Sequence, residues 1–140
     1  MQNSSLLVTT HIAAGVVIKK DGKYLLVQEN HPNPDIYGKW NLPSGRVEKG
    51  QTIEETVIRE TKEETGYGVE LVRKLGIFHE IAEKPVVHIF EGKIKGGELK
   101  YPKDEILAAG WFTYEEIKKM RDLLRDKFIL AVINTMEKVI

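Results

Sequence analysis

Arg-Glu-Thr-Lys-Glu-Glu-Thr-Gly, at residues 59–66, is the stretch of sequence that decides the fold. On an α-helix, residues three and four positions apart lie on one face, with Cβ atoms about 5–6 Å apart. Glu60, Glu63 and Glu64 form such a set, and three carboxylates this close together repel one another. A hard divalent cation such as Mg²⁺ or Mn²⁺ removes the conflict because it prefers oxygen ligands. The stretch therefore predicts a helix that carries either a metal site or a solvated acidic face.

The flanking residues predict that this helix runs from Thr52 to Thr65. Thr52, with Glu55 three residues later, fits a capping box, and Gly66 stands where a glycine commonly ends a helix. The helical wheel directs one stripe of residues toward the core: Ile53, Val57, Ile58 and Thr61. Glu64 falls inside that stripe and Glu60 lies at its edge. A carboxylate directed toward a core costs several kcal/mol unless it is compensated, so both interpretations of the acidic face stay open.

Strands are predicted on both sides of the helix. The segments rich in aliphatic and β-branched residues are His11–Lys19, Lys23–Gln28, Val69–Phe78, Val86–Ile94 and the short Trp111–Thr113. Asp21-Gly22 predicts a hairpin between the first two segments, and Gly96-Gly97 predicts a turn. Asn30–Gly38 is expected to be an exposed loop. Helices are predicted at Tyr114–Met120 and at Asp126–Ile140, the second with an apolar stripe that packs in the core. The order of these elements predicts an α+β or mixed α/β domain with a largely mixed sheet.

Composition restricts the class of protein. The chain has 140 residues, as many basic as acidic side chains (21 of each), and a pI of about 6.9. This balance argues against a broad basic surface that grips a nucleic-acid polymer. No apolar run approaches the roughly 20 residues of a membrane span, and the first ten residues lack the features of a signal peptide, so a cytoplasmic location is expected. The absence of cysteine excludes disulfides, thiolate catalysis and cysteine-zinc sites.

The wider spacing around the acidic stretch resembles a known signature. Gly45, Gln51 and residues 59–66 fall in the register of the Nudix box, Gly-x5-Glu-x7-Arg-Glu-U-x-Glu-Glu-x-Gly-U, where U is a bulky aliphatic residue. All but one of its fixed polar and glycine positions match, and Leu42-Pro43-Ser44-Gly45 is similar to the Leu-Pro-Gly-Gly entry of the family. The chain is therefore identified as similar to the Nudix hydrolases, with a MutT-like Nudix domain over residues 1–140 and the box at residues 45–67.

The resemblance implies a fold, a reaction and a set of site residues. The implied fold is a single-domain α/β/α sandwich with a mixed central sheet. The implied reaction is divalent-metal-dependent hydrolysis of a pyrophosphate bond in a nucleoside diphosphate linked to another moiety, with water as the nucleophile. By this analogy Glu60, Glu63 and Glu64 bind Mg²⁺, or Mn²⁺, with help from the Ser44 carbonyl. Arg59 orients the acidic cluster.

The departures from the box identify the positions to examine. Gln51 replaces the first glutamate of the box, so it can hydrogen-bond Arg59 but brings no charge to that guanidinium. Thr61 and Tyr67 stand where aliphatic residues are usual, which indicates repacking. Ser44 replaces a glycine and keeps the backbone carbonyl that ligates metal in the family.

The general base varies between branches of the family and is either a glutamate of the box or an acid on a later loop. The later acids here are Glu98, Asp104 and Glu105. Glu105 lies six residues before Trp111. That position resembles a fourth metal-binding acid in the branch that clears oxidised nucleoside triphosphates, so Glu105 is included in both the catalytic and the metal-binding set.

Recognition of the base or of the second moiety is expected to involve aromatic and histidine side chains: Tyr37, Trp40, Phe78, His79, His88 and Phe90. Two histidines nine residues apart do not make a zinc site. The expected partner is a small nucleotide or diphosphate, with a homodimer as a further possibility. Two other functions remain as alternatives, a housecleaning triphosphatase for damaged nucleotides and a non-catalytic Nudix-fold binding or regulatory module.

Overall fold

The computed structural model describes residues 11–80 and 83–138. Its strands are β1 (Ile12–Lys20), β2 (Lys23–Glu29), β3 (Trp40–Asn41), β4 (Ser44–Arg46), β5 (Tyr67–Phe78), β6 (Val86–Gly97) and β7 (Ile106–Phe112). Its helices are α2 (Ile53–Thr65), α3 (Tyr114–Lys119) and α4 (Phe128–Glu137), with a 3₁₀ turn η1 at Arg121–Leu123. None of the helices in the described ranges is long and apolar enough to cross a membrane.

The seven strands form one mixed sheet in the order β3-β2-β1-β6-β5, with β4 paired to β1 and β7 paired to β2. The central strand β1 runs parallel to β6, from Ile12↔Val86 to Ile18↔Gly92. Strands β2 and β4 both run antiparallel to β1. The predicted hairpin at Asp21-Gly22 is confirmed, and so is the mixed character of the sheet.

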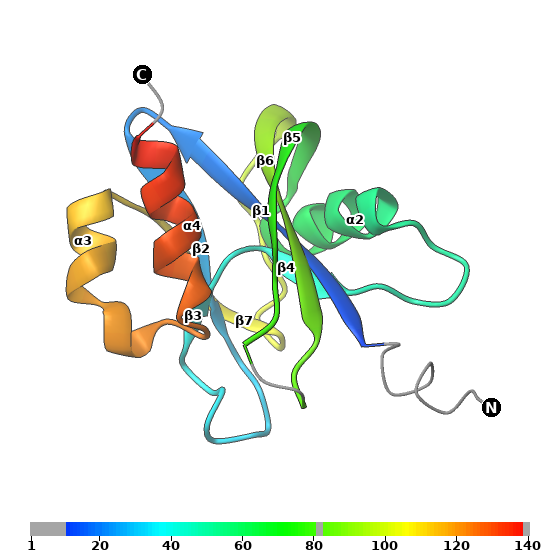
Figure 1. Cartoon of the computed structure of the whole chain (residues 1–140), viewed down its shortest axis with the longest axis horizontal. Helices are drawn as coiled ribbons and strands as arrows, with labels where there is room; N and C mark the ends of the chain where they lie inside the picture. Colours follow the sequence, from blue (N-terminus) through cyan, green and yellow to red (C-terminus); the bar gives the residue numbers. More distant parts are fainter. Residues whose placement is uncertain (1–10, 81–82, 139–140) are drawn as a thin grey trace.

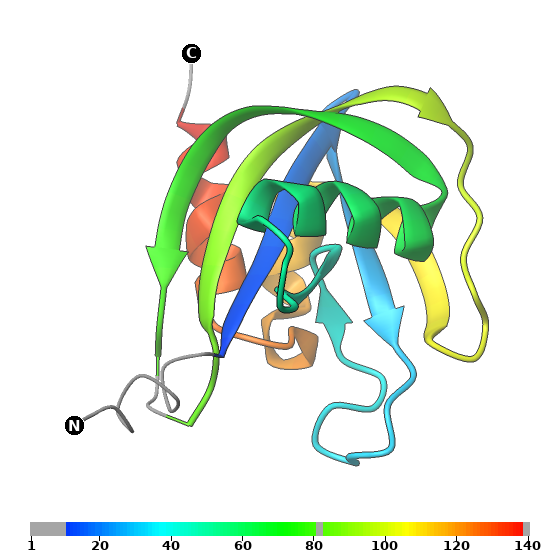
Figure 2. The same ribbon diagram turned by 90° about the vertical axis from the view of Figure 1, so that its right-hand side faces the viewer.

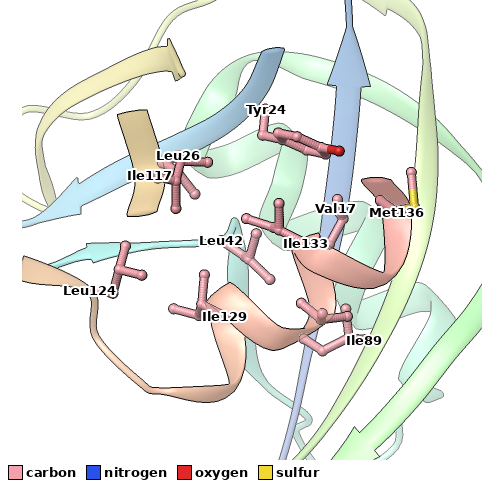
Figure 3. Packing of buried hydrophobic residues seen from close by; sticks show 11 residues of the cluster. Val17, Tyr24, Leu26, Leu42, Ile89, Ile117, Leu124, Ile129, Ile133 and Met136 are labelled. Carbon is pink, nitrogen blue, oxygen red and sulfur yellow. The ribbon is translucent and has the colours of Figure 1, made fainter. Parts of the chain in front are cut away.

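Helices cover both faces of this sheet (Figure 1), and α2 crosses one face while α3 and α4 pack on the other (Figure 2). The alternation of side chains along β1 builds two cores, since successive residues of a strand point to opposite faces. Val17 joins Leu42, Ile129 and Ile133 on the side of α4 (Figure 3). Val16 joins the cluster on the side of α2. The α/β/α sandwich expected from the resemblance is confirmed.

Helix α2 begins and ends as its sequence predicts, but its buried face is different. The Thr52 side chain accepts from the Glu55 N–H in a complete capping box, and Gly66 has φ 83°. Ile58, expected in the core, is 40% exposed. Thr61 is buried as expected, and Thr65 is buried as well. Their hydroxyls donate to the carbonyls four residues earlier, at 2.7 and 2.6 Å. Because those hydroxyls are satisfied within the helix, threonine packs against the sheet without an unpaired polar group.

The boundaries of three predicted elements are wrong, two of them because strand pairing extends further than the sequence indicates. Gly96-Gly97 is not a turn but the last part of β6, opposite Gly68 and Tyr67 of β5. The short segment predicted at Trp111–Thr113 is part of the longer β7, which pairs along β2. Helix α4 begins at Phe128 rather than at Asp126, and residues 139–140 of the predicted helix lie outside the described residues.

Candidate active site

The residues of the box meet where α2 passes over the β4 strand. Ser44 pairs with Gly15 of β1, which holds the β4 backbone in place. The Ser44 N–H donates to Glu64 Oε1 at 3.1 Å. Two positions separated by twenty residues are thereby joined directly. The Glu64 carboxylate therefore lies against the Ser44 backbone.

Gly45 has no side chain because Glu60 occupies the space. A Cβ built on Gly45 would overlap Glu60 Cγ and Cδ. The glycine that opens the box is therefore required for close approach of the Glu60 side chain, rather than for an unusual backbone conformation. This contact positions a second carboxylate of α2 against the β4 strand.

Arg59 links the acidic residues to the loop before the helix. Its Nη1 lies 3.0 Å from Glu60 Oε2 and 3.2 Å from Glu63 Oε1. Its Nη2 donates to Gln51 Oε1 at 2.9 Å. Its Nε is buried and has no hydrogen-bond partner among the described residues. Arg59 thus lies where the resemblance implies, between the loop and the carboxylates, with one donor unused.

Burial disfavours the ionised forms of Glu60 and Glu64 in this cluster. Burial raises the pKa of Glu64 well above its usual value, and the negative charges of Glu60, Glu29 and Glu105 add to the rise against the opposing Ser44 hydrogen bond. Burial also raises the pKa of Glu60, although Arg59 beside it acts in the opposite direction. Both groups hold their negative charge less readily than a carboxyl in water. A positive charge bound beside them would reverse that cost.

Of the three later acids, Glu105 is the one that faces this cluster. Strand pairing brings it there, since the Asn30 N–H donates to the Glu105 carbonyl at 3.0 Å at the end of the β2–β7 ladder. Its charge raises the pKa of both Glu60 and Glu64. Asp104 is exposed, and Glu98 lines a separate open hollow beside Glu63.

The donor set fits a hard divalent cation in its chemistry. Glu60 and Glu64 offer oxygen donors whose ionised forms are disfavoured by burial, and the Ser44 backbone lies next to Glu64. Within residues 11–80 and 83–138, no three acidic or histidine side chains are already arranged to enclose an ion. One reason is that the Glu63 carboxylate is turned toward Arg59. Ligation by Glu63 therefore requires its side chain to change rotamer.

A pocket of about 330 Å³ adjoins the cluster, and its size is within the range of small-molecule sites. We call it the central pocket. Glu29, Ser44 and Gly45 line the end beside α2, and Phe78 and Phe128 line another part of its wall. Phe78 is the one residue of the predicted aromatic and histidine set that the pocket contains.

The other members of that set lie elsewhere. Tyr37 is 54% exposed, and His79 is also on the surface. Trp40 packs edge-on against Phe112, with ring centroids 5.0 Å apart. Phe90 is buried in the core under α2, because it occupies the opposite face of β6 from the pocket-lining Val87 and Ile89. His88 is half-buried on the same face of β6 as Phe90, so the structure brings none of these five side chains to the central pocket.

Four residues that line the pocket were not predicted as site residues, because they belong to no recognisable motif. Glu29 ends a strand without any motif, and Arg125, Asp126 and Phe128 belong to a segment that was expected only to pack. Arg125 Nη1 donates to both oxygens of Glu29, at 3.1 and 2.9 Å. Only the packing of α4 against β2 shows that these residues share a site.

Comparison with known proteins supports the assignment to a family. The NUDIX domain model matches residues 9–132. An ADP-ribose pyrophosphatase of Methanocaldococcus jannaschii is 36% identical, over 78% of this chain and 65% of its own. An 8-oxo-dGDP phosphatase of Mus musculus is 35% identical, over 73% of this chain and 32% of its own. The chain thus spans from about a third to just under two thirds of these relatives.

Solved structures agree with the sequence comparison. A NUDIX hydrolase from Nitrosomonas europaea superposes with a TM-score of 0.81 at 28% identity, covering 91% of this chain and 88% of that one. An ADP-ribose pyrophosphatase from Streptococcus suis superposes with a TM-score of 0.73 at 25% identity, covering 94% of each chain. The chain belongs to the NUDIX family, which confirms the resemblance found in its sequence.

Proposed function

We propose that this chain is a divalent-metal-dependent pyrophosphohydrolase that cleaves the pyrophosphate bridge of a nucleoside diphosphate linked to another moiety. The observation that carries the proposal is the pair of partly buried carboxylates, Glu60 and Glu64, which lie beside Arg59 and against the pocket-lining Gly45 and Ser44. Burial raises the pKa of both carboxyls, which supports a site where a bound cation would stabilise their ionised forms. Nudix hydrolases use divalent metals, and Mg²⁺ is the ion we propose here, with Mn²⁺ as a substitute.

The residues would divide the work as follows. Glu60, Glu63 and Glu64, with the Ser44 carbonyl, would hold the cation. A bound cation neutralises the phosphoryl oxygens and lowers the barrier to attack by water. Arg59 holds Glu60 in place through their ion pair.

Glu105 is our candidate for the general base. It faces the cluster from the turn just before β7, and it is exposed to water. Water attacks one phosphorus of the bridge, the bridging P–O bond breaks, and the proton of the water goes to the base. The central pocket would hold the nucleoside part of the substrate during this step.

A second candidate function is removal of oxidised nucleotides, because one relative is named for 8-oxo-dGDP. Another is named for ADP-ribose, which carries an adenine base, so these names leave the base open. The non-catalytic alternative has less support, since Arg59, Glu60, Glu63 and Glu64 are all present. Gln51 is the feature that favours it.

Release of phosphate-terminated products across a panel of nucleotides tests the proposal. The panel contains ADP-ribose, other nucleoside diphosphate conjugates, dGTP and 8-oxo-dGTP, with and without Mg²⁺. Glu64→Gln and Glu63→Gln should each lower turnover at least about 10²-fold, as expected for loss of a transition-state charge contact. Glu54→Gln, a change at an exposed position of the same helix that no described contact uses, is the matched control. Wild-type rates in both active-site variants would show that the acidic face is only solvated surface.

A further inference from the structure

One end of the central pocket is aromatic. Phe78, at the end of β5, and Phe128, at the start of α4, stack with ring centroids 5.1 Å apart and an angle of 11° between the rings. Glu29 and Ser44, which lie beside the acidic cluster, line another part of the pocket. A nucleotide bound with its phosphates at the acidic cluster would therefore place its base toward the phenylalanines, where a flat ring gains stacking contact.

An ion pair is part of the same wall. Lys84 Nζ donates to Asp126 Oδ1 at 2.7 Å, and both side chains line the pocket. The Asp126 side chain is only 13% exposed. No residue in the described ranges donates a hydrogen bond to its second oxygen, Oδ2, and the Lys84 ammonium has further N–H groups. The pair thus presents a hydrogen-bond donor next to a charged acceptor.

The neighbouring ion pair does not offer the same pattern. Both carboxylate oxygens of Glu29 already accept from Arg125 Nη1. Glu29 also lies at the acidic end of the pocket, where its charge raises the pKa of Glu64. Of the two pocket carboxylates held in ion pairs, Asp126 is therefore the one with an acceptor available for a base.

We propose that Lys84 and Asp126 select a guanine-type base in the central pocket. The Watson–Crick edge of guanine presents the O6 acceptor beside the N1–H and N2–H donors. The O6 acceptor complements the Lys84 ammonium, and the N–H donors complement the Asp126 carboxylate. Adenine presents an N6–H donor and the lone pair of N1, so the carboxylate would face a second acceptor. Oxidation of guanine at C8 leaves the edge unchanged. The proposal rests on the proposed function, which places the nucleoside in this pocket.

Binding of nucleoside monophosphates tests the selection without any need for turnover. We expect GMP to bind about 10- to 100-fold more tightly than AMP in calorimetric titrations, with IMP between them because it lacks the N2 amine. The Asp126→Asn variant should lose this preference, since its amide N–H₂ would face the N1–H of guanine. Lys84→Met keeps the aliphatic stem and should weaken GMP and IMP while leaving AMP unchanged.

A matched control separates recognition from stability. Glu115→Gln breaks the exposed Lys118–Glu115 pair of α3, which has a similar distance of 2.9 Å, and should leave the ratio of GMP to AMP affinity unchanged. If Asp126→Asn lowers the melting temperature but keeps that ratio, the pair only fastens the β5–β6 loop to α4 and the proposal is overturned.

The outcomes also distinguish this proposal from the proposed function. Equal affinity of the wild type for GMP and AMP, together with metal-dependent hydrolysis of panel substrates, would overturn base selection alone. Failure to bind either monophosphate and to hydrolyse any panel substrate would overturn both.

Discussion

At the scale of single residues, the contacts of Arg59 explain what the departure at position 51 does. Gln51 Oε1 accepts from Arg59 Nη2, so the neutral side chain keeps the hydrogen bond of the family's glutamate. The buried Arg59 Nε has no acceptor among the described residues. A carboxylate has a second oxygen where the glutamine amide has an N–H₂ group. The site therefore has a donor that a glutamate at position 51 is suited to satisfy.

Gln51→Glu is expected to be as active as the wild type or more active at saturating Mg²⁺. A charge-assisted hydrogen bond to Arg59 is worth about twice a neutral one, so a gain of about 0.5–1.5 kcal/mol, up to about tenfold in kcat/KM, is reasonable. The same variant should be less stable without metal, because it adds a carboxylate beside Glu60 and Glu63. Steady-state kinetics and melting temperatures in EDTA measure the two effects. A clear loss of activity at saturating Mg²⁺ would show that Gln51 has a different role.

Glu64 makes the stability of the metal-free protein depend on pH. Burial raises the pKa of Glu64 in the folded state above its value in the unfolded chain. At a pH between these two pKa values, the folded state therefore binds a proton that the unfolded chain has released. Its contribution to stability is then fully present below about pH 4.5 and is lost as the pH rises through the folded pKa. Glu64→Gln keeps an acceptor for the Ser44 N–H but cannot ionise.

We therefore expect the melting temperature of Glu64→Gln in EDTA to exceed that of the wild type at about pH 8. The difference should shrink as the pH falls toward about 5, because the wild-type carboxyl then takes up its proton. Mg²⁺ should raise the melting temperature of the wild type more than that of the variant. A difference that stays constant across this pH range would exclude ionisation of Glu64 as its cause.

At the scale of secondary-structure elements, the acidic face depends on how closely α2 approaches β4. The approach is set by buried threonines on the helix and by Gly45 on the strand, since both are small. The helix ends at Gly66, where a Cβ would overlap the Glu98 carbonyl oxygen. The elements thus pack so that carboxylates, rather than aliphatic side chains, fill the space between them.

Gly45→Ala tests this packing. The added methyl group would displace the Glu60 side chain, so we expect at least about a tenfold loss of kcat and a cost of about 1–3 kcal/mol in unfolding free energy from overpacking. Gly96→Ala is the control, because a Cβ at Gly96 has no heavy atom within 4 Å. Normal activity of Gly45→Ala with an unchanged melting temperature would mean that Glu60 is not confined by this contact.

At the scale of the whole molecule, the sheet brings together acids that are distant in sequence. Strand β7 lies beside β2, which places Glu105 next to Asn30 and toward the carboxylates of α2. Segments before and after the box also meet in the central pocket, where Arg125 of the α4 segment binds Glu29 of β2. The candidate site is thus completed by two regions that the box does not include.

Glu105→Gln should lower kcat about 10²-fold or more with a smaller change in KM, as expected for a general base. Glu98→Gln and Asp104→Asn, both on the same connection, should have milder effects because the structure does not direct these acids at the cluster. Kinetics of the three variants on one panel substrate measure the difference. A larger loss in Glu98→Gln would assign the base to that residue instead.

The sequence by itself determined the acidic helix and the class of the fold. The capping box at Thr52, the helix stop at Gly66 and the spacing of three glutamates are local features, governed by backbone hydrogen bonds and helical periodicity. They therefore appear in the order of the residues. The same periodicity misplaced Ile58, because a wheel shows which residues share a face but not which face the sheet covers.

The tertiary structure alone decided which residues surround the acidic helix. The pairing of β2 with β7 brought Glu105 to the cluster and the packing of α4 brought Arg125 to Glu29, across separations in sequence that carry no local signal. It also decided that Phe78 of β5 lines the pocket while Phe90 of β6 does not. The two side chains lie on opposite faces of the sheet, and the sequence does not show what packs on each face. Long-range pairing and side-chain packing depend on the whole chain at once, and for this reason the pocket could not be predicted from its residues in order.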